Sequence, residues 1–336
     1  MSYFKKKSIG YMVVPDYRDA QTTLAHAALA EKSGFSGIWI PDHFHPWFHT
    51  SANEYHSWIW LSTAMDRIRS IPFGTAVTAP ILRYHPALIA QAFATLEEIH
   101  GHRIVLGVGS GEALNEVPLG FDWPSLGERI DRMVEAVKII RMLGTQEFVD
   151  YQGKYFALNK ANLYMKSSLP IFISALGPRT ARIAGRFGDG FITVPAPLDY
   201  IKNTIFPKIT EGAESVGRSI NDITKVIELD VSLDDDYDKA LNSLRCFKPN
   251  LLPNIFHSSE YDPRILEKRG SIEVSDAELA KAFIIGSSVD AHIKRIEELF
   301  DVGFDHVYVS SNSPDEERFL GEYKKKVVPY FEEKMK

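Results

Sequence analysis

Short apolar runs and segments with helical spacing alternate along most of the chain. The apolar runs predict strands at 8–14, 36–41, 70–79, 103–108, 169–175, 190–194, 225–232, 283–286 and 305–310. Apolar positions three and four residues apart predict helices at 19–34, 58–68, 85–100, 125–143, 178–187, from about 199, at 288–302 and at 315–334. This alternation is typical of a parallel sheet whose strands are joined by helices.

About eight strands with intervening helices favour an α/β fold of the (β/α)8 TIM-barrel type. An open dinucleotide-binding sheet is disfavoured because no Gly-x-Gly-x-x-Gly follows the first strand. We expect residues 1–336 to form one barrel domain with two insertions. The first, at about 145–165, resembles a hairpin with a turn at Gln152-Gly153, and the second, at about 233–280, is predicted to be loop-rich and near the barrel mouth.

Composition and charge narrow the classes of function. The 336 residues carry a net charge of −6, so the basic surface typical of nucleic-acid binding is not expected. Cys246 is the single cysteine, which excludes a disulfide within the chain and a cysteine-based metal site. The sequence has no run of 18 apolar residues and no recognisable signal peptide. These features predict a cytoplasmic enzyme or binding protein with no membrane partner.

Polar and aromatic residues follow the apolar strand at 36–41. Asp42, His43 and Trp47 lie at its carboxyl end, where a barrel presents catalytic side chains. Imidazole titrates near neutral pH and is therefore suited to act as a general acid or base. A histidine that only caps a buried strand end is an equally weighted alternative.

Two further strand ends carry candidate binding groups. The glycine-rich turn at 107–111 is followed by Glu112 and Asn115, and its backbone amides suit an anion or serve only a tight turn. The turn at 175–180 places Arg179 near a helix N-terminus, either to bind a phosphate or carboxylate or as a surface arginine.

Four histidines occur within fourteen residues, which raises the question of a metal site. They are His43, His45, His49 and His56. Pro46 interrupts any helix that would align them, and no cysteine lies nearby to complete a ligand set. We therefore predict no metal.

Taken together, these segments resemble the deazaflavin-dependent branch of the luciferase-like flavin oxidoreductases. Within it, the chain is most similar to coenzyme F420-dependent secondary alcohol dehydrogenases and F420-dependent glucose-6-phosphate dehydrogenases. The similarity runs nearly end to end and is carried by residues 42–47, 83–95, 109–116 and 177–190.

The resemblance implies a TIM-type barrel, a homodimer, and coenzyme F420 at the carboxyl face of the barrel. It implies that His43 takes the proton of the substrate hydroxyl, that Trp47 stabilises the reacting centre, and that Glu112 serves ring nitrogen 1. It also implies a non-proline cis bond at Ala76-Val77 behind the ring. The implied cofactor contacts are Asp42, Ala76, Val77, Ala79, Ser110, Gly111, Asn115, Leu176, Gly177, Arg179 and Thr180.

The sequence departs from the sugar-phosphate enzymes where those enzymes bind phosphate with basic residues. The corresponding positions are Pro197 or a neighbour such as Val194, then His257, and Ala282, so two cations are missing and one is replaced by a titratable group. Ala79 stands where those enzymes have a threonine against the cofactor. Lys202, Lys248 or Arg264 remain as candidates to compensate.

The leading hypothesis is therefore an F420-dependent dehydrogenase of a secondary alcohol, with a sugar-phosphate dehydrogenase as the alternative. More remote alternatives are a methylene-tetrahydromethanopterin reductase, an FMN-dependent monooxygenase and a non-catalytic cofactor-binding protein.

Overall fold

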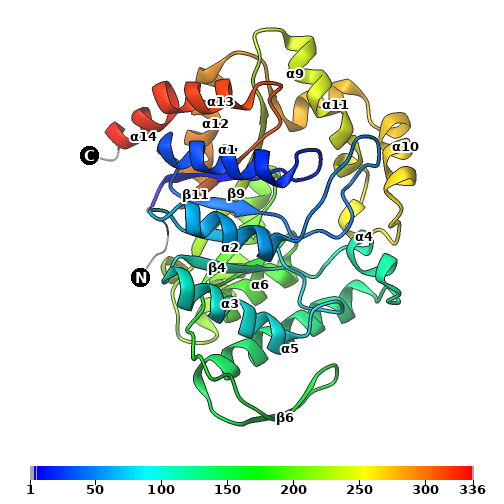
Figure 1. Ribbon diagram of the computed structural model, residues 1–336, viewed down its shortest axis with the longest axis vertical. Coiled ribbons are helices and arrows are strands. Elements are labelled where there is room, and N and C mark those ends of the chain that lie inside the picture. The colour runs from blue at the N-terminus through cyan, green and yellow to red at the C-terminus, as the bar shows by residue number, and fades with distance from the viewer. Residues whose placement is uncertain (1–3, 5, 335–336) are drawn as a thin grey trace.

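The computed structural model describes residues 4 and 6–334 and shows a closed barrel of eight parallel strands (Figure 1). Around the barrel the strand order is β1-β2-β3-β4-β7-β8-β9-β11, and β11 pairs with β1 to close it. The strands are β1 (Ser8–Met12), β2 (Ile38–Ile40), β3 (Phe73–Thr75), β4 (Ile104–Val108), β7 (Ile171–Ser174), β8 (Gly190–Thr193), β9 (Thr224–Ser232) and β11 (His306–Ser311). This confirms the predicted (β/α)8 architecture.

Helices join successive strands around the outside of the barrel. They are α1 (Ala20–Lys32), α2 (Ser57–Arg67), α3 (Pro86–His100), α5 (Leu126–Thr145), α6 (Pro178–Phe187), α8 (Phe206–Glu214), α12 (Val289–Val302), α13 (Glu316–Glu322) and α14 (Val328–Lys334), with two short ones, α4 (Ala113–Glu116) and α7 (Leu198–Tyr200). Their starts follow from the sequence. His85 caps α3, accepting a hydrogen bond from the Ala87 amide, and Pro86 occupies the first turn.

Large side chains fill the barrel interior below its carboxyl end. The cluster comprises Phe4, Met12, Trp39, Val105, Phe172, Ile192, Val226 and Tyr308. Trp39 stacks on Tyr308 with ring centroids 5.3 Å apart, and its indole N–H donates to His306. Gly74 of β3 leaves room for this indole, because a Cβ there would lie 2.5 Å from the Trp39 ring. The packed interior forms a floor on which a site at the carboxyl end can rest.

β3 is shorter than the strand predicted at 70–79. The peptide bond between Ala76 and Val77 is cis, as the resemblance implies, and the regular ladder stops just before it. Thr78 then forms a single parallel bridge with Val108 of β4. The apolar pattern continues through this bulge, which is why the sequence predicts a longer strand.

Residues 233–280 differ from the loop-rich segment that the sequence predicts, because they are largely helical. The segment contains α9 (Tyr237–Leu244), two 3-10 stretches (Arg245–Leu251 and Ile255–His257), α10 (Pro263–Glu273) and most of α11 (Asp276–Ala282). Figure 1 places α10 on the side of the molecule opposite the two chain ends, near α4. The segment packs its own apolar cluster, which includes Leu244, Phe247 and Leu266, against Trp47 and Phe48.

Three further strands lie outside the barrel ring. β5 (Val149–Gln152) and β6 (Ala157–Ala161) pair antiparallel as a separate two-stranded sheet that projects beyond α5 (Figure 1). The strand predicted at 283–286 is reduced to β10 (Ile284–Ile285), which adds to the end of β9. Within residues 4 and 6–334, the helices lack the combination of length and apolar character needed to cross a membrane.

Candidate active site

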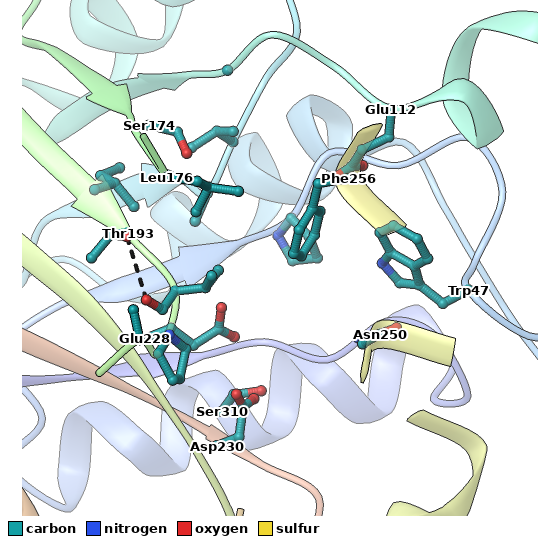
Figure 2. A pocket seen from close by; sticks show the side chains of 18 of the residues that line it. Trp47, Glu112, Ser174, Leu176, Thr193, Glu228, Asp230, Asn250, Phe256 and Ser310 are labelled. Atoms are coloured by element: carbon teal, nitrogen blue, oxygen red, sulfur yellow. Dashed lines mark hydrogen bonds between the residues drawn. The ribbon is translucent and has the colours of Figure 1, made fainter. Parts of the chain in front are cut away.

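A cavity of about 840 Å³ opens at the carboxyl ends of the barrel strands. Its lining contains sixteen of the residues proposed from the sequence: His43, Trp47, Ala76, Val77, Ala79, Ser110, Gly111, Glu112, Asn115, Leu176, Gly177, Arg179, Thr180, Val194, His257 and Ala282. Figure 2 shows Trp47, Glu112 and Phe256 on one side of this cavity and Glu228, Asp230 and Ser310 on the other. One cavity therefore brings together groups that are as far apart in the chain as His43 and Ala282.

His43 projects from the segment after β2. Its side chain is 13% exposed, and its Nε2 lies 3.6 Å from a carboxylate oxygen of Glu112. Burial, and then the positive charge of Arg83, lowers the pKa of His43 to about 3. The imidazole is therefore neutral at physiological pH and able to accept a proton.

Glu112 lies at the end of the turn that follows β4, just before α4. Burial raises its pKa to about 7, although Arg83, Arg129 and a hydrogen bond from Asn115 act in the opposite direction. The side-chain amide of Asn115 donates to Glu112 at 3.0 Å, and its oxygen accepts the Phe44 N–H at 2.7 Å. Asn115 thus ties the tip of β2 to the carboxyl that faces it.

Asp42 does not line the cavity, which is a departure from its expected role as a direct cofactor contact. Its carboxylate accepts hydrogen bonds from Thr78 at 2.7 Å, Ser57 at 3.2 Å and Tyr84 at 3.4 Å. Arg83 forms an ion pair with it at 3.3 Å. Asp42 therefore supports the wall behind His43 by holding the segments after β2 and β3 together.

The backbone conformation and tight packing of Gly111 shape the glycine-rich turn after β4. Gly111 has φ +75°, and a Cβ there would lie 2.7 Å from Ile81. Arg129 of α5 is buried behind the turn and donates to the Gly111 carbonyl at 2.8 Å. The turn is thus held rigidly, with Ser110 and Glu112 on the cavity side.

The first turn of α6 forms another part of the cavity wall. Gly177 precedes the helix, Pro178 begins it, and Arg179 and Thr180 follow. The amide groups at a helix N-terminus and an arginine attract anions. Arg179 also pairs with Asp131 of α5 at 2.6 Å, and both side chains are about half exposed.

Trp47 and the residues of the 233–282 segment form the outer wall. The Trp47 ring meets His43 edge-on, with centroids 6.0 Å apart, and meets Phe256 in the same way at 5.8 Å. His257 and Ala282 also lie on this wall, as does Val194 after β8. The three positions proposed to face the substrate are therefore brought to one cavity, although none carries a permanent positive charge.

Sequence reasoning missed several acidic groups at this site. Glu228 and Asp230 line the cavity from β9, and Asp16 lines it from the segment after β1. Burial is the main cause that raises the pKa of Asp230 to about 7 and that of Glu228 well above its ordinary value. Acidic residues at alternate positions of an apolar strand are a detectable signal, because both must point into the barrel.

The four clustered histidines have separate surroundings. His56 caps α2, accepting from the Trp58 amide, whereas His45 stacks on Phe44. The His49 backbone N–H donates to Glu267. Among the described residues, the side chains that converge closely enough to share a metal ion are Asp16, His43 and Glu54, a set that the histidine spacing did not suggest.

Comparison with known proteins agrees with this geometry. The model of the luciferase-like monooxygenase family matches residues 5–306. The chain belongs to this family. An F420-dependent glucose-6-phosphate dehydrogenase of Nakamurella multipartita is 37% identical over 307 residues, covering 90% of each chain.

Similar solved structures extend the comparison. An F420-dependent secondary alcohol dehydrogenase, solved with an F420-acetone adduct, superposes with a TM-score of 0.92 at 36% identity, covering 96% of this chain and 98% of that one. A coenzyme F420-dependent tetrahydromethanopterin reductase from Methanopyrus kandleri has a TM-score of 0.78 at 25% identity, covering 96% and 99%. The resemblance inferred from the sequence is confirmed at the level of the family and the fold.

Proposed function

We propose that this protein is an F420-dependent dehydrogenase that oxidises the CH–OH group of a secondary alcohol. The observation that supports this most strongly is the pairing of a neutral imidazole, His43, with a carboxyl that titrates near neutrality, Glu112, at 3.6 Å in one cavity. Both the glucose-6-phosphate and the secondary alcohol dehydrogenases among its relatives act on CH–OH donors.

The cavity fits a deazaflavin with an acidic tail. Ala76, Val77 and Leu176 offer apolar surface to a planar ring, and Glu112 offers a proton at its edge. A side chain added to Gly177 would have open space around it, so the wall is recessed beside the N-terminus of α6, where an anionic tail is favoured. When bound, F420 supplies a ring that accepts a hydride.

The side chains then have distinct tasks. His43 accepts the hydroxyl proton at Nε2, because burial and Arg83 keep the imidazole uncharged until that proton arrives. Trp47 packs against His43 and Phe256 and excludes water from the reacting end. Glu112, which carries a proton up to about pH 7, holds a proton for the cofactor ring.

The charges around the cavity favour an unphosphorylated substrate. Four carboxyl groups line it, from Asp16, Glu112, Glu228 and Asp230. Because burial raises the pKa of each of these carboxyls, some are protonated and some ionised near neutral pH, so together they can donate and accept hydrogen bonds with hydroxyl groups, whereas the ionised ones would repel a phosphate dianion.

The second candidate is glucose 6-phosphate. Lys281, which precedes Ala282 in the chain, and Arg295 of α12 line the cavity and offer it positive charge, although neither was among the positions that the sequence comparison suggested. The identity of 37% to a glucose-6-phosphate dehydrogenase also favours this substrate.

A steady-state assay separates these substrates. Oxidised F420 is mixed with isopropanol, glucose 6-phosphate or glucose, and the loss of deazaflavin absorbance is followed. The proposal predicts turnover with isopropanol and no acceleration by the phosphate group of the sugar. Faster turnover of glucose 6-phosphate than of the other two would replace the alcohol by the sugar phosphate, and turnover of none would remove both.

The three more remote alternatives would each give a different result with the same purified protein. A tetrahydromethanopterin reductase would reduce its pterin substrate with reduced F420, and an FMN-dependent monooxygenase would copurify with FMN. A non-catalytic binding protein would bind F420 equally well after His43→Ala, with no turnover before or after. A homodimer and a cytoplasmic location stay predictions; sedimentation equilibrium tests the first and cell fractionation the second.

A further inference from the structure

Three buried polar atoms converge behind the catalytic face of His43. They are Nδ1 of His43, Oε2 of Glu54 and Oδ1 of Asp16, and in the described part of the chain none has a hydrogen-bond partner. The Nδ1–Oε2 distance is 4.0 Å, and the three residues bring ligand atoms within 4.8 Å of one another. Buried polar atoms are usually paired, so a convergence of three unpaired atoms calls for a shared function.

Glu54 is held in place by its neighbours along the chain. The backbone N–H of Asn53 donates to the Asp16 carbonyl at 2.6 Å, and the side-chain amide of Asn53 donates to the Arg18 carbonyl at 2.7 Å. The other carboxylate oxygen of Glu54 accepts the Tyr55 N–H at 3.1 Å. The Glu54 side chain is only 7% exposed and lies outside the cavity lining, so it acts on His43 rather than on a substrate.

At neutral pH, the carboxyls of Glu54 and Asp16 together hold about one proton. Burial, and then Asp16, raises the pKa of Glu54 to about 9, with Asp42 acting in the same direction and Arg83 in the opposite one. Burial raises the pKa of Asp16 to about 6. The pair therefore carries about one negative charge and faces an imidazole whose other neighbours are Arg83 and Glu112.

We propose that Glu54 is a positioning residue for His43. With Asp16, its carboxyl receives the Nδ1–H of the imidazole, which leaves the Nε2 lone pair on the side of the cavity and Glu112. One bridging water or a small rotation of Glu54 closes the 4.0 Å separation, as is common for catalytic hydrogen bonds in ligand-free enzymes. This inference rests on the proposed role of His43 as the base.

The movement of protons explains how Asp16 and Glu54 would assist His43 as a base. If bound F420 accepted the hydride of the alcohol, the hydroxyl proton would go to Nε2, and the Nδ1 proton would pass to the pair formed by Asp16 and Glu54, in which Asp16 is the ionised member at neutral pH. The pair goes from one negative charge to none, so no unpaired imidazolium is left in a buried site that disfavours it.

Histidine NMR on the cofactor-free protein tests this without any turnover. The nitrogen chemical shifts of 15N-histidine-labelled protein report the tautomer of His43, identified by the signals lost in His43→Asn. We expect Nδ1–H in the wild type and in the control Glu97→Gln, a buried glutamate on α3 that pairs with His102. Glu54→Ala should move His43 to the Nε2–H tautomer.

Kinetics with isopropanol give an independent measurement. Glu54→Gln keeps an acceptor oxygen but cannot exchange with Asp16 the proton that the two carboxyls share at neutral pH, so kcat should fall at least about tenfold while KM and F420 affinity change less than about twofold. An Nε2–H tautomer in the wild type, or an unchanged tautomer in Glu54→Ala, would overturn the proposal. If Glu54→Ala does not fold, an unchanged kcat in Glu54→Gln overturns it.

Absence of wild-type isopropanol turnover counts against the proposed substrate only, because the NMR result still decides the role of Glu54.

Discussion

The pKa values of His43 and Glu112 move in opposite directions for the same physical reason. Burial disfavours the charged form of both groups, which lowers the pKa of the imidazole and raises that of the carboxyl. At neutral pH the site thus holds an unprotonated imidazole next to a carboxyl that is still partly protonated. Two neighbouring groups whose pKa values are shifted apart in this way are suited to act as base and acid, here His43 and Glu112.

Replacing Glu112 by glutamine tests its assignment as the acid. Because ionised Glu112 has no proton to give, wild-type kcat/KM for isopropanol should fall as the pH rises through about 7. Glu112→Gln should lack this fall and be about a hundredfold slower at pH 6. Glu97→Gln serves as the control with the wild-type profile. A fall near pH 7 that persists in Glu112→Gln would assign it to another group.

Individual residues were predictable where a strand end exposed them. His43 and Glu112 were found because each follows an apolar strand, and the same rule applied to β1 would have found Asp16. Glu228 and Asp230 were detectable from their alternation within an apolar strand. Glu54 lies in the irregular segment before α2, and its proximity to His43 follows from the Asn53 hydrogen bonds, which no local pattern reveals.

At the scale of elements, α6 and the turn after β4 contribute backbone as well as side chains. The α6 N-terminus is suited to the acidic tail of the cofactor, and Arg179 adds a charge there. Most helix starts and strand positions were predictable because capping residues and apolar spacing are local. Residues 233–280 were predicted to be loop-rich but are largely helical; Pro263, for example, begins α10 after the capping residue Asp262 and does not interrupt a helix.

Arg179→Ala should weaken the binding of F420 by about three- to tenfold, and the loss should be smaller in high salt. Fluorescence titration of the cofactor at two salt concentrations measures both effects. Arg182→Ala is the matched control, because Arg182 lies on the same helix and pairs with Glu211 away from the cavity lining. Equal losses in the two variants would show that α6 acts only through its overall charge.

Gly111→Ala should destabilise the fold more than Gly120→Ala. Both glycines have positive φ, but only at Gly111 would the new methyl group contact Ile81 and Ala79. The backbone conformation costs about 1 kcal/mol in either variant, and the contact adds roughly 1 kcal/mol at Gly111. Urea unfolding measures the difference in free energy. A larger loss in Gly120→Ala would contradict the tight turn described here.

For the whole molecule, the buried carboxyls make stability depend on pH. A carboxyl whose pKa rises on folding binds more protons when folded, so stability falls as the pH rises from its ordinary value to its folded value. For Glu112 and Asp230 this window ends at about 7, and for Glu54 at about 9. The lowered pKa of His43 and His306 acts in the opposite sense, but only below about pH 6.5.

The melting temperature of the cofactor-free protein should therefore decrease between pH 6.5 and 9. Glu54→Gln should show a smaller decrease, because it removes the group that is the last of these three carboxyls to ionise. Differential scanning calorimetry across this range measures both proteins. A flat or rising wild-type profile would mean that these carboxyls are more hydrated than their burial indicates.

Deuterium transfer tests directly whether a carbinol gives its hydride to F420 in the cavity beside His43. The enzyme is mixed with oxidised F420 and isopropanol labelled with deuterium at carbon 2, and the reduced cofactor is analysed by mass spectrometry. We expect one deuterium per reduced F420 with the wild type and almost no reduced F420 with His43→Ala. Reduced cofactor without deuterium, or equal transfer in His43→Ala, would contradict it.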